Sequence, residues 1–61
     1  MKVATLINKM EYDVKIKVWD VNENETEPLY ECISSGCPYE LCERDVTGVY
    51  AGNLFIGIDT D

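Results

Sequence analysis

The chain contains no histidine and only one arginine, and no apolar run approaches the roughly 18 residues that cross a membrane. Without histidine there is no histidine-based triad, imidazole relay or metal–imidazole site. The glycine-rich phosphate-binding motifs are absent too. At the start of the chain, Asn8 and Lys9 come too early for the apolar stretch of a secretory signal. We therefore expect a cytoplasmic globular protein that is not an enzyme, carries no cofactor and does not enter a membrane.

A chain of 61 residues, of which 46% are apolar, fits one small folded domain over residues 1–61. Such a domain buries roughly 60% of its unfolded surface, so its stability margin is thin. Small domains of this kind often gain additional stability from disulfides, a bound metal or oligomerisation.

Three cysteines follow each other at equal spacing as C-x4-C-x4-C, at Cys32, Cys37 and Cys42. A closed zinc site uses four ligands, so the fourth would have to be a carboxylate or come from a second chain. An odd count also fits poorly with a secreted disulfide framework. We interpret them as reduced thiols that pack as small hydrophobic groups, predict no metal site, and keep a cysteine-based metal module as an alternative.

The first half of the chain changes from a helical period to a strand period. Spacing typical of one helix face occurs at Val3, Leu6, Ile7 and Met10. From residue 12 the period is two, which predicts a strand with these residues facing inward: Tyr12, Val14, Ile16 and Val18. Trp19 then falls on the outer face beside two lysines, unless a bulge in the strand turns it inward. The acidic segment 22–28 reads as a turn between antiparallel strands.

A second strand is predicted from Leu29 to Ile33, and the pattern leaves open which of its faces points inward. After the break at residues 34–36, the segment 37–44 indicates one or two helical turns. Pro38 suits the first helical position. Leu41 and Cys42 are the expected inward contacts.

The last segment predicts a hairpin of residues 46–50 and 54–58 around a two-residue turn at Gly52-Asn53. The predicted pairs are Ala51 with Leu54, Tyr50 with Phe55, Val49 with Ile56, and Thr47 with Ile58. This register puts Tyr50 and Phe55 together on one face. It also sets Gly48 opposite Gly57, leaving a slot for a backbone or a bulky ring.

The predicted fold class is therefore α+β. A short N-terminal helix packs on a four-stranded antiparallel meander, with a short helical turn between the second and third strands. The architecture is analogous to small Sm-like or SH3-like barrels.

Acidic side chains dominate the chain after residue 18. Residues 19–61 carry ten acids and one base, whereas the first 18 residues carry four lysines and two acids. A field of this sign repels nucleic acid phosphates and anionic lipid, and it favours a partner with a basic surface. We predict a partner-binding surface formed by Trp19, Asp20, Glu23, Glu25, Glu27, Tyr30 and Glu31. Ordinary solubility is the alternative explanation of these charges.

The string MKVATLI, followed by YDVKIKVWD, LYE, a P-x-E-L turn and a closing hairpin, resembles small uncharacterised proteins of phages and mobile elements in Gram-positive bacteria. The resemblance covers nearly the whole chain. It implies an accessory protein and assigns no functional residue.

Three hypotheses follow. The first is a non-enzymatic accessory module that binds a protein partner through its acidic surface, one version being inhibitory mimicry of nucleic acid. The second is a structural subunit, a homo-oligomer that associates through an exposed sheet edge and the face carrying Trp19, Tyr50 and Phe55. The third is the cysteine-based metal module.

Overall fold

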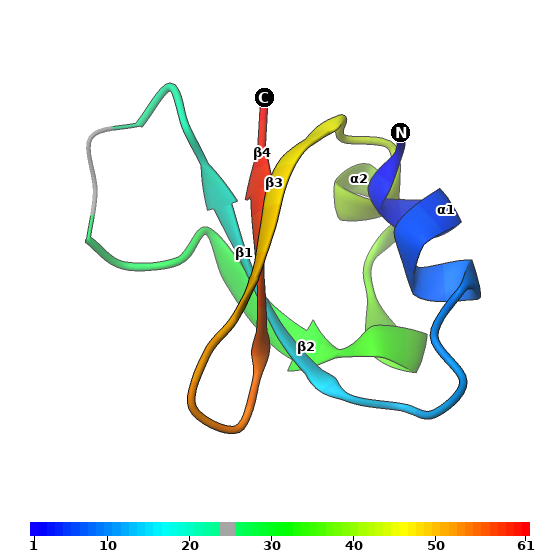
Figure 1. The fold of residues 1–61 in the computed structure, drawn as a ribbon. Helices are drawn as coiled ribbons and strands as arrows, with labels where there is room; N and C mark the ends of the chain where they lie inside the picture. The colour runs from blue at the N-terminus through cyan, green and yellow to red at the C-terminus, as the bar shows by residue number, and fades with distance from the viewer. Residues whose placement is uncertain (24–25) are drawn as a thin grey trace.

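The computed structural model describes residues 1–23 and 26–61 (Figure 1). Its elements, in chain order, are α1 (Val3–Asn8), β1 (Lys15–Asp20), β2 (Tyr30–Ile33), the 3₁₀ turn η1 (Ser34–Gly36), α2 (Tyr39–Cys42), β3 (Val46–Ala51) and β4 (Ile56–Thr60). Within the described ranges, no helix is long and apolar enough to span a membrane.

The four strands form one mixed sheet in the order β2-β1-β4-β3. β1 pairs antiparallel with β2 and parallel with β4, and β4 pairs antiparallel with β3. The α+β class is confirmed, but the prediction of an antiparallel meander is wrong. After β2 the chain crosses from one edge of the sheet to the other, through η1 and α2, before it adds β3 (Figure 1). The described pairings leave the sheet open, with β2 and β3 at its edges, and the barrel analogy finds no support in them.

Both helices lie on the same side of the sheet (Figure 1). The apolar core lies between these two layers and consists of Val3, Ile16, Val18, Leu41 and Ile58. Partly buried apolar groups surround it, among them Leu6, Ile7 and Met10 of the predicted helix face. A helix as short as α1 is marginal alone, so this packing is what holds it.

The first strand begins at Lys15, later than predicted. Ile16 and Val18 face the core as expected, and Val14 packs against it. Tyr12, however, is 74% exposed and does not face inward. Val14 already bonds to the chain after β2: its N–H donates to the Ser34 hydroxyl at 3.1 Å, and its carbonyl accepts from the Ser34 N–H at 2.8 Å.

The pairing of β2 with β1 resolves which face of β2 points inward. Cys32 lies opposite Ile16 and Tyr30 opposite Val18, so both share the core side of the sheet. In α2, Leu41 is buried as predicted, and Cys42 is half-buried. Pro38 is the residue that precedes the helix, with an extended ψ of 151°, and is not its first helical residue.

The hairpin of β3 and β4 exists, but its register is shifted from the prediction. Ala51 pairs with Ile56, Tyr50 with Gly57, and Val49 with Ile58, so the connection is longer than two residues. The Gly52 N–H donates to the Phe55 carbonyl at 2.9 Å, and Leu54 has a positive φ of 68°. Because the shift is an even number of residues from Val49 to Ala51, these side chains keep their predicted faces, whereas the register shifts by one further residue between Val46 and Gly48.

Gly48 and Gly57 do not face each other, contrary to the prediction. Gly57 lies opposite Tyr50, and a Cβ added at Gly57 would sit 2.2 Å from the Tyr50 ring carbon Cζ. Gly48 lies opposite Asp59. The prediction placed a backbone or a bulky ring in a slot between the two glycines. Instead, the Tyr50 ring lies directly on the backbone of Gly57 alone.

Candidate binding site around Trp19

Trp19 lies on the sheet face that the helices leave open. Along β1 the side chains alternate, so Ile16 and Val18 point to the helices while Trp19 points away from them. Leu29 immediately precedes β2 and donates its N–H to the Val18 carbonyl at 2.7 Å, which fixes it beside the end of β1, just beyond the last paired residues of the two strands. Trp19 and Leu29 therefore lie at the same end of the β1–β2 pair, and both line one cavity.

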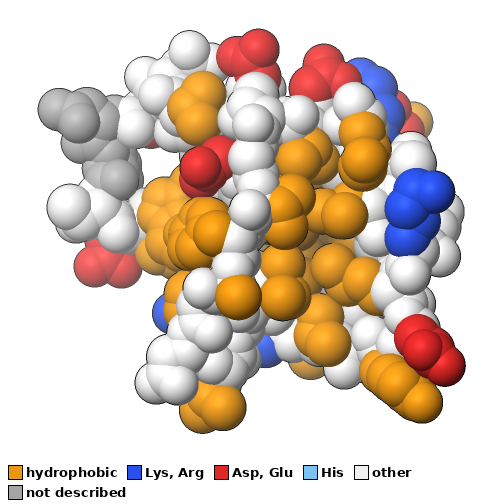
Figure 2. All heavy atoms as spheres, in the orientation of Figure 1, with side chains coloured by type: hydrophobic (Ala, Val, Ile, Leu, Met, Phe, Trp, Pro, Cys, Tyr) orange, Lys and Arg blue, Asp and Glu red, His pale blue; other side chains and the backbone are white. Residues whose placement is uncertain are grey.

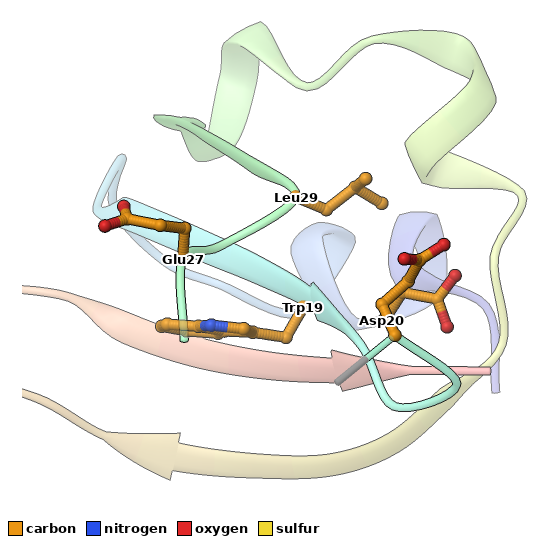
Figure 3. Close-up of a pocket in the computed structure, with 5 residues that line it drawn as sticks. Trp19, Asp20, Glu27 and Leu29 are labelled. Carbon is orange, nitrogen blue, oxygen red and sulfur yellow. The ribbon is translucent and has the colours of Figure 1, made fainter. Parts of the chain in front are cut away.

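Beyond this pair the chain forms a cavity of about 150 Å³, which we call the Trp19 cavity. It is lined by Trp19, Asp20, Glu23, Glu27 and Leu29. Figure 3 shows the indole ring edge-on, with Glu27 and Leu29 on the same side of it. An indole face together with carboxylates is the combination that attracts an organic cation, through the ring quadrupole and through charge.

Asp20 is fixed and charged at one end of the cavity. One of its oxygens accepts the Asn22 N–H at 2.9 Å, and the other lies 2.6 Å from the guanidinium of Arg44. These contacts, the backbone bond first, hold the pKa of Asp20 below its usual value. Arg44 also donates to Thr60, whose hydroxyl donates to the Trp19 carbonyl at 2.7 Å. The network positions both the carboxylate and the tryptophan backbone.

Glu23 and Glu27 are exposed, and neither forms an ion pair with another described residue. Asp20 already has the guanidinium of Arg44 beside it. The two glutamates therefore supply the carboxylates of the Trp19 cavity that are open to an incoming cation.

The other predicted surface residues lie apart from the cavity. Glu31 lies on the open face of the sheet, where it pairs with Lys17 at 3.2 Å. Tyr30 lies on the opposite side of the sheet, because it is paired with the inward-facing Val18. Glu25 is outside the described residues. Sequence reasoning missed Leu29 as a cavity residue because it was assigned only to a strand.

An aromatic cluster extends from Trp19 across the open face. The Trp19 ring centroid lies 5.8 Å from that of Tyr50 and 6.3 Å from that of Phe55, while Tyr50 and Phe55 meet edge to face. The ammonium of Lys17 lies 4.4 Å from the centroid of Phe55. Desolvation, with a smaller contribution from Asp59, raises the pKa of Tyr50. These contacts cover the sheet where no helix does.

The three cysteines lie on the helix side, half-buried and without disulfides. Cys32 and Cys37 pack against the core. Desolvation raises the pKa of the Cys32 thiol and, with the neighbouring Cys42, raises that of Cys37 to about 12. Both thiols are therefore protonated at neutral pH. Among residues 1–23 and 26–61, no group of three or more potential ligands is placed to hold a metal ion.

Comparison with known proteins identifies no relative: no family model, no curated protein and no solved structure matches the chain.

Proposed function

We propose that the chain is a non-enzymatic, cytoplasmic accessory module that binds a protein partner with a basic surface. The resemblance described above is the reason to propose a phage or mobile-element origin. The observation that supports the binding role most is the Trp19 cavity, where four of the seven surface residues predicted from sequence lie together: Trp19, Asp20, Glu23 and Glu27.

The chemistry of the cavity favours a lysine or arginine side chain from the partner. Its charged head would lie against the indole of Trp19 and between the carboxylates of Glu23 and Glu27, while Leu29 would contact the aliphatic stem. A negatively charged field around the site would speed the approach of a basic protein and oppose that of nucleic acid or anionic lipid.

Mimicry of nucleic acid is one version of this proposal. In that version the partner is a nucleic-acid-binding protein, and carboxylates take the place of phosphates in its basic groove. The cavity supports recognition of individual basic side chains. It does not distinguish a partner whose basic side chains normally bind phosphate from any other basic protein.

The single tryptophan gives a direct test. A short lysine- and arginine-containing peptide is titrated into the protein while Trp19 fluorescence is followed. We expect Glu23→Gln/Glu27→Gln to weaken binding about 2- to 30-fold at low salt, since each of the two exposed charge pairs contributes about 0.2–1 kcal/mol. Glu40→Gln/Glu43→Gln removes the same charge from the exposed residues in and after α2 and serves as the matched control.

Two outcomes would contradict the proposal. If both double variants weaken the peptide equally, net charge explains the binding and the cavity does not. If proteins retained from a bacterial lysate by the wild type are retained equally by Glu23→Gln/Glu27→Gln, the acidic surface is not the binding surface.

A further inference from the structure

The edge strand β3 carries unpaired backbone groups at a defined place. In an antiparallel ladder, backbone groups point alternately toward and away from the paired strand. The Gly52 N–H bonds to Phe55 across the hairpin, so Tyr50, two residues earlier, directs its backbone groups toward β4. Val49 and Ala51 therefore direct theirs outward. At the start of β3 the same edge is covered, because the Val46 N–H donates to the Met1 carbonyl at 2.7 Å.

The two edges of the sheet differ in how they are protected. β2 is preceded by Pro28 and carries Glu31, and both kinds of residue disfavour the addition of another strand. By contrast, residues 46–58 contain no charged residue at all, in a chain that is 28% charged. On β3, Val49 is 50% exposed and Tyr50 is 42% exposed. In Figure 2, hydrophobic side chains lie on both sides of the strip of backbone that β3 follows in Figure 1.

The distribution of charge makes a second copy of the chain a suitable occupant of this edge despite the net charge of −7. The acidic connection joins β1 and β2, which lie on the far side of the sheet from β3. If two sheets join through β3, seven strand spacings of about 4.8 Å separate the two β2 strands, or roughly 34 Å. That distance is several times the Debye length of about 8 Å at physiological salt, so the acidic connections barely repel each other.

We propose that two copies of the chain pair through β3 in antiparallel orientation around Tyr50, forming one continuous eight-stranded sheet. The outward backbone N–H and C=O groups of Val49 in each copy then form hydrogen bonds with those of Ala51 in the other copy. The Tyr50 side chains of the two copies meet on the open face, which extends the aromatic cluster across the twofold axis. β3 itself carries no charged residue, so no charge faces a like charge along the paired strands. The dimer is independent of the cavity and of any partner bound there.

Two double variants test this register. Val49→Lys/Ala51→Lys places lysines opposite lysines, whereas Val49→Lys/Ala51→Glu places each lysine opposite a glutamate of the second copy. Sedimentation equilibrium over a concentration series is expected to show a wild-type dimer. The lysine–lysine variant is expected to raise the dissociation constant at least about tenfold, and the lysine–glutamate variant to stay within about threefold of the wild type.

General charge repulsion predicts the opposite order, because the lysine–lysine variant has the less negative net charge. Ile33→Lys is the control at the β2 edge, where Ile33 is 54% exposed, and should leave association unchanged. Amide hydrogen exchange of the wild type gives a second readout that needs no variant: exchange at Val49 and Ala51 should slow as concentration rises. A monomer at all concentrations, or exchange at these two amides that is independent of concentration, would overturn the proposal.

Discussion

Replacing Gly57 with alanine tests whether the aromatic cluster depends on the bare backbone beneath it. The new Cβ would lie 2.2 Å from the Cζ atom of Tyr50, so the ring has to move away. Tyr50 would then lose its contacts with Trp19 and Phe55. Aromatic pairs contribute about 0.5–1.5 kcal/mol each beyond their buried area.

Part of this loss is offset, because alanine in a strand is favoured over glycine by roughly 0.5–1 kcal/mol. The net expectation is a loss of about 1 kcal/mol in the free energy of unfolding. For a domain of this size that corresponds to a melting temperature lower by roughly 4–8 °C. Circular dichroism during heating, combined with urea unfolding followed by Trp19 fluorescence, measures both quantities.

Gly48→Ala is the matched control, because the nearest atom to its added Cβ is an Asp59 oxygen at 3.4 Å, an ordinary contact. We expect this variant to be as stable as the wild type or about 0.5 kcal/mol more stable. In a Tyr50→Ala background, Gly57→Ala should cost nothing. The reasoning is refuted if Gly57→Ala is no less stable than Gly48→Ala, or if its cost is the same with and without the Tyr50 ring.

Three further predictions concern two polar side chains and one thiol. Thr60→Val leaves the Trp19 carbonyl and the Arg44 Nε without their partner, so we expect a loss of about 1–3 kcal/mol in urea unfolding, while Thr60→Ser keeps most of the stability. Because folding lowers the pKa of Asp20 from 3.8, its charged form stabilises the fold above that pH, and this stabilisation is lost as the pH falls through the folded-state pKa. The difference in stability between the wild type and Asp20→Asn should therefore disappear on acidification below about 3.8. A difference that persists at about pH 2 would contradict this. With its pKa raised to about 12, Cys37 should be alkylated at pH 8 much more slowly in the folded protein than in urea, as site-resolved mass spectrometry would show; equal rates would mean that the thiol is not desolvated.

Periodicity predicted the parts of the fold that depend on local alternation. The inward positions of Ile16 and Val18, the outward position of Trp19 and the buried Leu41 all follow from spacing alone. Spacing contains no information on which strands pair. The parallel contact of β1 with β4 was therefore missed, although both strands were recognised.

The hairpin register was wrong for a more specific reason. Gly52-Asn53 is a strong signal for a two-residue turn, but the Phe55 ring lies over Gly52, where a Cβ would be 2.1 Å from its Cζ atom. Leu54 also adopts a left-handed backbone conformation, which is uncommon for leucine and could not be expected from the sequence. The connection is wider as a result, and β4 starts at Ile56.

The candidate site was predicted in part. The acidic segment and Trp19 were recognised from composition and order, and the cavity brings them together. Tyr30 was included because it is a neighbour in sequence, yet its pairing with Val18 places it on the other side of the sheet. Leu29 was not included, since only the folded chain shows that it lines the same cavity as Trp19.

Among the described elements a ribosome releases β4 last, yet β4 lies between β1 and β3 inside the sheet. Ile58, which is fully buried, reaches the core only when this strand arrives. Until then β1 has only β2 as a partner in the sheet, and a two-stranded hairpin by itself is marginally stable in water. The parallel pairing of β1 with β4 thus makes completion of the sheet a late, long-range event along the chain.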